Sequence, residues 1–510
     1  MLLLVTSGIM AQQTELDLGL MRKLVMAEGA IKNLYVEDVD ETTLVESAIQ
    51  AMLKNLDPHS VYNTADEVKK LNEPLQGNFD GIGVQFNMAE DTLLVIQTVS
   101  GGPSQKVGIL AGDRIVAVND TAIAGVKMER TEIMKRLRGP KGTQVKLDIV
   151  RREVSEKMTF VVTRDKIPVN TLEAAYMATP KIGYIRLGSF GQTTHDEMME
   201  AMNKLLKKGM KDLILDLQDN GGGYLQAAVE IANEFLEKDQ LIVYTEGRRV
   251  PRQDFLAPGE GRFRKGRLVV LVNEYSASAS EIVTGAVQDW DRGYVIGRRS
   301  FGKGLVQRPI SFPDGSMIRL TVAHYYTPSG RCVQKPYGGD TDYQKELLNR
   351  FEHGEMMSAD SIHFPDSLKY ATRVLGRTVY GGGGIMPDRF IPLDTLSYTK
   401  YHRELVAKGA VNNANLYFID TYRQEWNKKY PSFASFKKKF EVTDEMLDVV
   451  LKKGEEAKVE YNEMQFEASK PLMRLQMKAL IARDLWTMSE YFEIINENND
   501  SFKAALDYLK

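Results

Sequence analysis

The spacing of apolar residues divides the chain into helical ends and a strand-containing middle. Residues 16–71 and 395–510 repeat apolar side chains every three or four positions, which predicts a helical N-terminal segment and a helical C-terminal region. Such amphipathic faces usually pack against their own domain. Association between protomers, giving a homo-oligomer through the helical regions, is the alternative.

The middle of the chain changes character twice. Residues 77–165 hold short β-rich segments and one helix near Glu129 to Leu137, which predicts a small separate domain. After Pro168, strand and helix patterns alternate, which indicates βα units and a largely parallel sheet. We therefore expect an α/β multidomain protein whose core spans residues 166–394. A polar insertion at about 334–379 interrupts this core, and its role cannot be read from the pattern.

One strand-to-helix junction carries candidate chemistry. The apolar run Leu268–Val272 has the length and composition of a buried strand, and apolar spacing after it predicts a helix that begins close to Ser278. The first N–H groups of a helix are unpaired and favour negative charge, so an oxyanion could be held at this point. The Ser278-x-x-Glu281 spacing also fits a capping box without any chemistry.

A lysine between two glycines follows this helix. Gly302 and Gly304 would let the backbone approach its neighbours closely, so that Lys303 points at something specific. A surface turn is the alternative interpretation. Upstream, Asp216 to Gly223 forms a Gly-rich loop after a predicted strand, where sites of α/β proteins gather. Its N–H groups could complete an oxyanion hole, with Gly222 as the expected donor, or the glycines could only form a helix-entry turn.

Composition removes several classes of function. The 510 residues suggest several domains, and the formal net charge of −3 gives no basic excess for nucleic acid. With one cysteine, Cys332, and no H-E-x-x-H motif, we expect no disulfide framework, no zinc site and no cofactor. No run of apolar residues is long enough to span a membrane. His59 lies in an Asp-Pro-His-Ser stretch, which predicts a turn and not a catalytic residue.

The first residues resemble the end of an export signal. Residues 2–10 are mostly apolar and the chain turns polar after Ala11, so we expect a signal remnant at 1–11. The basic start of such a signal is missing, and a misassigned start or a disordered terminus is the alternative. If residues 1–11 are the remnant of an export signal, the protein is exported to the bacterial periplasm or cell envelope.

Two motifs at a fixed separation resemble a known family. Ser-Ala-Ser-Ala-Ser-Glu at 276–281, followed by Phe-Gly-Lys-Gly-x-Val-Gln at 301–307, is similar to the signature of the carboxyl-terminal processing peptidases, also called tail-specific proteases. Gly381 to Asp388 is similar to a family motif that ends the protease core. The segment 77–165 resembles a PDZ domain, with Gly81-Ile82-Gly83-Val84 similar to its carboxylate-binding loop.

This resemblance implies a serine endopeptidase with a crotonase/ClpP-like α/β core. It assigns Ser278 as the nucleophile, Lys303 as the general base, and Gln307 as the group that orients the lysine. Gln307 could also be a solvated strand residue. The N–H groups of Ala279 and Gly222 would hold the oxyanion, and the PDZ loop would capture the free C-terminal tail of a protein or peptide substrate.

One residue departs from the family pattern, because Gln218 stands where arginine is usual. Glutamine cannot reproduce the bidentate ion pairs of arginine, so a role for residue 218 is not inferred. The rival class of function is a non-enzymatic adaptor, whose PDZ domain binds tails beside an inert α/β scaffold. An adaptor gives no reason for Ser278 and Lys303 to occur together at the family spacing.

Overall fold

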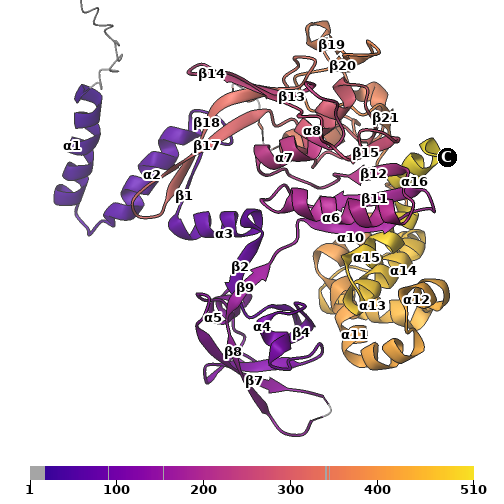
Figure 1. Ribbon diagram of the computed structural model, residues 1–510. Helices are drawn as coiled ribbons and strands as arrows, with labels where there is room; N and C mark the ends of the chain where they lie inside the picture. The colour runs from indigo at the N-terminus through magenta and orange to yellow at the C-terminus, as the bar shows by residue number, and fades with distance from the viewer. Residues whose placement is uncertain (1–17, 90, 153, 339–341, 344) are drawn as a thin grey trace, which may run out of the picture. The chain divides into compact units, whose positions relative to one another are not determined.

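The computed structural model describes residues 18–89, 91–152, 154–338, 342–343 and 345–510 (Figure 1). The chain falls into two compact units, which we treat separately for the described residues. The first unit runs to Val68 and includes Gln307–Thr321, and the second holds Lys69–Val306 and Val322–Lys510. The signal remnant expected at 1–11 lies outside the described residues.

The first unit contains α1 (Leu18–Leu34), α2 (Glu41–Lys54) and β1 (Val61–Asn63). Asp40 begins α2, because its carboxylate accepts a hydrogen bond from the Thr42 N–H at 3.0 Å. β1 pairs antiparallel with β18 (Met317–Tyr326), where Tyr62 faces Ile318.

Asp57 fixes the turn between α2 and β1. Its carboxylate accepts hydrogen bonds from the N–H groups of His59 and Ser60 at 2.8 and 2.9 Å. It also accepts one from the Thr321 hydroxyl at 3.1 Å. The Asp-Pro-His-Ser stretch is therefore a turn bonded to β18, as its sequence predicts.

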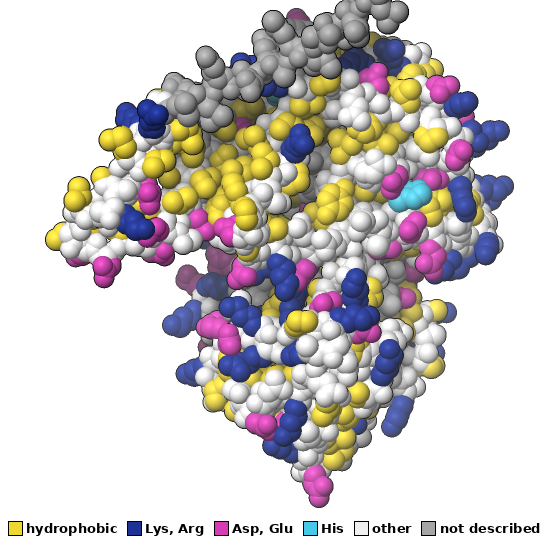
Figure 2. All heavy atoms as spheres, turned by 60° about the vertical axis from the view of Figure 1, so that its left-hand side comes forward, with side chains coloured by type: hydrophobic (Ala, Val, Ile, Leu, Met, Phe, Trp, Pro, Cys, Tyr) yellow, Lys and Arg dark blue, Asp and Glu magenta, His cyan; other side chains and the backbone are white. Residues whose placement is uncertain are grey.

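The helices of the first unit expose apolar side chains. On α1 and α2 these include Leu20, Leu24, Val25, Met26, Leu34, Val45 and Met52. Figure 2 brings the side of Figure 1 that carries these helices forward, and hydrophobic side chains gather on the face it shows. Among the described helices, none combines the length and the apolar character that a membrane crossing requires.

The small β-rich domain lies in the second unit. Within the described residues, β3 to β8 form one sheet in the order β3-β4-β5-β7-β8, with β6 paired to β5, and β2 pairs with β9. Its apolar centre holds Leu93, Ile115, Ile133 and Leu147. The helix α3 (Ala65–Gln76) precedes this domain in the chain, and the elements of the domain are β2 (Asn78–Gly81), β3 (Val84–Ala89), β4 (Thr92–Thr98), α4 (Pro103–Lys106), β5 (Arg114–Val118), β6 (Thr121–Ala122), α5 (Arg130–Leu137), β7 (Gln144–Val150), β8 (Met158–Thr163) and β9 (Asp165–Pro168).

A largely parallel sheet forms the α/β core. Its strands, counted among the described residues, follow the order β10-β11-β12-β15-β16-β21, and every neighbouring pair except β10 and β11 is parallel. The strands are β10 (Leu172–Met177), β11 (Ile182–Leu187), β12 (Asp212–Asp216), β15 (Leu268–Val272), β16 (Tyr294–Gly297) and β21 (Arg389–Phe390). The flanking elements are α6 (Thr194–Lys207), α7 (Leu225–Asn233), β13 (Leu241–Gly247), β14 (Val250–Leu256) and α8 (Ala279–Asp289). The strand β17 (Leu305–Ser311) follows β16 in the chain and belongs to the first unit from Gln307 onward.

Helices cover both faces of this sheet. One face packs against α6, α7 and α8 in a cluster that includes Leu215, Val270, Met202 and Val283. The opposite face packs Tyr184 and Val269 against Phe502 and Ala505 of α16 (Asp500–Tyr508). The predicted packing of the C-terminal helices against their own domain is thereby confirmed for α16.

The remaining helices follow the core. The insertion holds α9 (Glu346–Glu352), η1 (Ala359–Ser361), η2 (Asp366–Leu368), β19 (Lys369–Ala371) and β20 (Thr378–Tyr380). The C-terminal region holds α10 (Lys400–Ala407), α11 (Ala410–Lys429), α12 (Phe433–Lys439), α13 (Asp444–Glu456), α14 (Glu463–Leu485), α15 (Met488–Ile495), η3 (Asn496–Asn498) and α16. A second apolar cluster, with Phe418, Phe436, Val450 and Met477, holds this region together.

Candidate active site

Ser278 lies at the turn between β15 and α8, at the predicted start of the helix. Its backbone has φ 57° and ψ −112°, a conformation that a residue with a Cβ rarely adopts. Such strain persists where the surrounding structure enforces it, and it gathers at functional sites. The side chain is half-buried, and the Ala279 N–H that follows it is the first of α8. Ser278 is therefore presented at a helix N-terminus.

Glu281 joins this turn to the lysine loop, which is the stretch at residues 298–304 between β16 and β17. Its fully buried carboxylate accepts hydrogen bonds from the backbone N–H groups of Ser278 and Lys303, both at 2.9 Å. The Gly302 N–H and the Ser300 hydroxyl donate to its other oxygen at 2.7 and 2.6 Å. Burial raises the pKa of Glu281 above its ordinary value of 4.5, against these hydrogen bonds, which lower it. The glutamate of the capping box thus fixes both candidate catalytic segments.

Tyr325 of β18 makes a second connection between these segments. Its hydroxyl lies 3.1 Å from the Ser278 carbonyl oxygen and 2.5 Å from the Lys303 carbonyl oxygen, to which it can donate. Burial raises the pKa of Tyr325 well above its ordinary value, so the hydroxyl keeps its proton and remains a donor.

The glycines beside Lys303 are buried, so the surface-turn interpretation of this loop is wrong. A Cβ on Gly304 would lie 2.8 Å from the Gln334 backbone nitrogen, which no side chain could tolerate without a shift of the backbone. Lys303 itself is half-buried. The glycines therefore permit the close approach that the sequence predicts.

The insertion holds the lysine loop from outside. Arg350 of α9 donates to the carbonyl oxygens of Arg299 and Ser300 at 2.7 and 3.1 Å. The Lys335 N–H donates to the Gly302 carbonyl at 2.9 Å. The Lys335 ammonium is paired with Glu346 of the same helix at 2.8 Å. One role of the insertion is thus to support the loop that carries Lys303.

The Gly-rich loop lies directly against Ser278. A Cβ on Gly222 would stand 2.8 Å from the Ser278 Cβ and 3.0 Å from the Ala279 nitrogen. The Gly222 N–H donates to Asn220 Oδ1 at 2.9 Å, so this expected oxyanion donor is engaged in the free protein. Asn220 is fully buried, and its carbonyl accepts from the Ala277 N–H at 3.0 Å and from the Ser280 hydroxyl at 2.8 Å. Asn220 thus joins the two loops.

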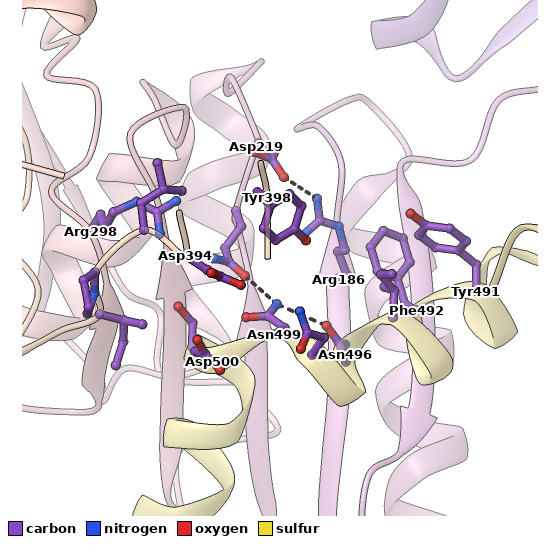
Figure 3. Close-up of a pocket in the computed structure, with 17 residues that line it drawn as sticks. Arg186, Asp219, Arg298, Asp394, Tyr398, Tyr491, Phe492, Asn496, Asn499 and Asp500 are labelled. Carbon is purple, nitrogen blue, oxygen red and sulfur yellow. Dashed lines mark hydrogen bonds and ion pairs between the residues drawn. The ribbon is translucent and has the colours of Figure 1, made fainter. Parts of the chain in front are cut away.

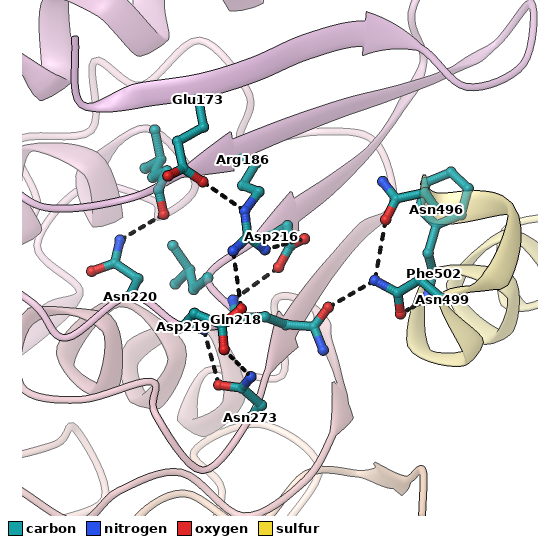
Figure 4. A network of polar contacts seen from close by, with 12 residues as sticks. Glu173, Arg186, Asp216, Gln218, Asp219, Asn220, Asn273, Asn496, Asn499 and Phe502 are labelled. Atoms are coloured by element: carbon teal, nitrogen blue, oxygen red, sulfur yellow. Dashed lines mark hydrogen bonds and ion pairs between the residues drawn. The ribbon is translucent and has the colours of Figure 1, made fainter. Parts of the chain in front are cut away.

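A polar network supports the start of this loop (Figure 4). Arg186 of β11 donates to Asp216 at 2.9 Å and to Asp219 at 3.1 Å. Asn273 donates to Asp219 at 2.7 Å. The side chain of Gln218 is buried and accepts a hydrogen bond from Asn499 at 3.0 Å.

Gln307 belongs to the first unit, four residues after Lys303 in the sequence. Its side-chain amide donates to the carbonyl oxygen of His59. The contact ties β17 to the Asp57 turn, so Gln307 is more than a solvated strand residue. Its expected role toward Lys303 stays a prediction.

The expected tail-binding loop lines a groove of about 310 Å³ beside β3 and α5. Among the described strands, β3 pairs with β4 alone, so its other edge can accept an added strand. The groove is lined by Phe79, Gly81, Ile82, Gly83, Val84, Gln85, Phe86, Arg130, Met134, Leu137 and Arg138.

Four family models match segments of the chain. They are peptidase family S41 at residues 181–344, the PDZ domain at 81–162, the activating protease CtpB N-terminal domain at 6–67, and a family of unknown function at 401–487. The chain is 36% identical over 314 residues to carboxy-terminal processing protease CtpA of Bacillus subtilis, covering 61% of this chain and 66% of that protein. It is 37% identical over 311 residues to a carboxy-terminal-processing protease of Bartonella bacilliformis, covering 60% and 70%.

The chain belongs to the carboxy-terminal processing protease family. The predicted family, the fold class and the class of serine-type peptidase are confirmed. A solved structure of photosystem II D1 C-terminal processing protease also matches, with a TM-score of 0.38 at 26% identity over 73% of this chain and 87% of that one. The alignments with the two curated relatives span about two thirds of their length.

Sequence reasoning missed three residues that organise the site: Asn220, Tyr325 and Arg350. The capping-box spacing was a signal for the bond from Glu281 to Ser278, but nothing in the sequence pointed to its bond with Lys303. Among the described residues, no group of three or more His, Cys, Asp or Glu side chains is arranged to hold a metal ion.

Proposed function

We propose that Ser278 attacks the peptide bond and that Lys303 removes its proton and later protonates the leaving amine. The observation that carries this proposal is the shared hydrogen bonding of Glu281, which fixes the backbones of Ser278 and Lys303 through one buried carboxylate. A serine hydroxyl is a weak nucleophile without a base, and a neutral lysine amine can supply one. The product of attack is an acyl-enzyme, which water then hydrolyses.

The oxyanion would be held by the Ala279 N–H and by the Gly222 N–H. Gly222 lies over the nucleophile turn, which supports this assignment. Because its N–H is bound to Asn220 in the free protein, this donor has to exchange that bond for the oxyanion during the reaction. Gln307 would act on Lys303 as an uncharged orienting group.

The PDZ domain would capture the free C-terminal tail of a protein or peptide. Among the described strands β3 pairs on one side only, so the peptide can add to its other edge as an extra strand, and the N–H groups of the loop at 81–84 can receive the peptide's carboxylate. In this division, residues 77–165 capture the tail, 166–394 cleave it, and 395–510 form a helical appendage.

Export to the bacterial periplasm or cell envelope is part of this proposal, and it rests on the apolar stretch before Ala11. Association of protomers is supported by the apolar side chains exposed on α1 and α2. N-terminal sequencing of the protein recovered from cells tests the first point, and its mass in solution tests the second.

An active-site label tests the chemistry without any need for tail capture. A fluorophosphonate should modify Ser278, as peptide mapping by mass spectrometry would detect. Lys303→Arg should react far more slowly, because a guanidinium cannot accept the proton. Labelling of Lys303→Arg at the rate of the unchanged protein would show that another group is the base.

Matched peptides test tail capture. Amidation of the C-terminus removes a charged acceptor and leaves N–H donors of the loop unpaired, so cleavage should slow by roughly ten- to a hundredfold. A small activated ester, which has no tail, serves as the control and measures the chemistry alone. Equal cleavage of the acid and the amide would exclude capture of the carboxylate.

A further inference from the structure

The last segment of the chain, residues 488–509, lies after the final residue of every family match described above. Within it, Phe502 meets the Tyr184 ring edge-to-face at 5.4 Å, and Tyr508 stacks on Tyr294 at 4.3 Å. Arg267, just before β15, donates to the Leu509 carbonyl. The segment is therefore fixed on the face of the core sheet opposite α8.

Asn499 connects this segment to the loop after β12 (Figure 4). Its amide nitrogen donates to Gln218 Oε1 at 3.0 Å and to Asn496 Oδ1 at 3.1 Å. Its oxygen accepts from the Phe502 N–H at 3.2 Å, which caps α16. Every polar atom of the side chain thus has a partner, and the amide is held in one orientation.

Gln218 stands at the base of the loop that carries the proposed oxyanion donor. Its own N–H donates to Asp216 at 2.8 Å. Two residues further on, the Asn220 carbonyl accepts hydrogen bonds from the Ala277 N–H and the Ser280 hydroxyl, which lie in the turn that carries Ser278. A shift of residue 218 would therefore be passed along a short, hydrogen-bonded stretch of backbone to the turn that carries Ser278.

A cavity of about 270 Å³ lies beside this contact (Figure 3). Gln218 and Asn499 both line it, together with Arg186, Arg298 and Tyr398. Packing alone does not fix a side chain that borders a cavity, because there are no atoms on that side to hold it. The backbone of Gln218 is held by its bond to Asp216, and the hydrogen bond from Asn499 holds its side chain.

We infer that Asn499 is a positioning residue for the peptidase reaction, and that it acts through Gln218 to hold the loop of the oxyanion donor. The inference rests on the proposed function. It assigns a role to the C-terminal segment that the S41 and PDZ matches do not cover, and it gives residue 218 a function suited to an amide where the family usually has arginine.

Three single variants test this inference. Gln218→Met keeps the length of the side chain but removes the acceptor. Asn499→Ser keeps a good helix cap for α16 but is too short to reach Gln218. Asn498→Ser is the matched control, because Asn498 lines the same cavity and has no recorded hydrogen bond of its side chain among the described residues.

The measurement is kcat and KM for a free-acid peptide, together with the rate of labelling by a fluorophosphonate. Gln218→Met and Asn499→Ser should each lower kcat and the labelling rate by about fivefold, as expected for one lost hydrogen bond, with KM unchanged. The double variant should be no slower than either single one, since both changes remove the same contact. Asn498→Ser should match the unchanged protein.

Any of three results would overturn the inference. These are effects that multiply in the double variant, an equal loss of kcat in Asn498→Ser, or a change in KM alone. Thermal unfolding shows whether a variant is folded, and if one is not, the other still reports the lost contact. If the unchanged protein neither cleaves nor is labelled, the proposed function fails. If the unchanged protein is active, and Gln218→Met and Asn499→Ser are as fast as it is, only the role of Asn499 fails.

Discussion

Oε2 of Glu281 lies 2.9 Å from the backbone nitrogen of Lys303. The same oxygen accepts the Ser278 N–H, so one buried atom holds the backbones of the proposed nucleophile and base. A buried carboxylate is stable where its oxygens are hydrogen-bonded, and here every recorded donor comes from one of the two catalytic segments or from Ser300. The relative position of the two segments is therefore built into the protein before any substrate binds.

Glu281→Gln should lower both activity and stability. One carboxylate oxygen would become an NH₂ group facing N–H or O–H donors, so at least one buried donor would lose its acceptor. We expect the free energy of unfolding to fall by about 1–3 kcal/mol in urea titration. Glu260→Gln, at an exposed position, is the control and should change neither property. Full activity of Glu281→Gln would contradict the role given to the carboxylate.

Tyr325→Phe should slow cleavage while the protein remains folded. The change removes the hydroxyl that lies between the Ser278 and Lys303 carbonyl oxygens and leaves both without this donor. The neighbouring Tyr326→Phe should behave as the unchanged protein, because the ring of Tyr326, which the variant keeps, makes its contacts with Tyr244 and His324. Peptide turnover measures both variants, and equal rates for the two would argue against the bridge.

Arg350→Met should release the lysine loop from α9. Burial, with the charge of Arg299 beside it, lowers the pKa of Arg350 to about 10, so the guanidinium stays charged at neutral pH. Its two recorded bonds to loop carbonyls need a fork of donors, and for this reason Arg350→Lys should not restore activity. Fluorophosphonate labelling of Ser278 measures the effect, with the exposed Arg248→Met as control. Restoration by lysine would mean that charge alone matters.

His195 should make stability depend on pH. Its hydrogen bond to Glu234, at 2.8 Å, raises the pKa of His195 above its ordinary value of 6.5. The folded protein then binds this proton more tightly than the unfolded chain does. The resulting stabilisation is complete below the unfolded pKa and is lost as the pH rises through the folded pKa.

The difference in unfolding free energy between the unchanged protein and His195→Gln should therefore be larger at about pH 6 than at about pH 9. Denaturant titrations at the two pH values measure this difference. A difference that grew as the pH rose would contradict the assigned direction.

Local patterns predicted the elements of the core well. The apolar run before Ser278 became β15 with the expected bounds, and α8 begins at Ala279 as its spacing indicates. Both features depend on residues close together in the chain, because burial of a strand and of a helix face leaves a local periodicity. The close backbone approach at the glycines beside Lys303 could also be predicted, because such an approach excludes a Cβ.

The contacts that assemble the site could not be predicted from local sequence patterns. Tyr325 and Arg350 reach the lysine loop from β18 and α9, and no local pattern in the chain predicts that these elements lie beside it. The link from Asn499 to Gln218 joins residues 281 positions apart. A hydrogen bond between distant side chains leaves no periodic signal in a single sequence, and only the fold brings such partners together.

Cleavage of an unfolded protein by the unchanged protein and by Ser278→Ala tests whether Ser278 is the nucleophile of a peptidase. Mass spectrometry would identify the fragments and locate the new C-termini. We predict fragments cut near the substrate's C-terminus with the unchanged protein and none with Ser278→Ala, whose unfolding free energy should fall by only about 0.5–2 kcal/mol from the lost helix cap. Cleavage by folded Ser278→Ala at a comparable rate would contradict the account.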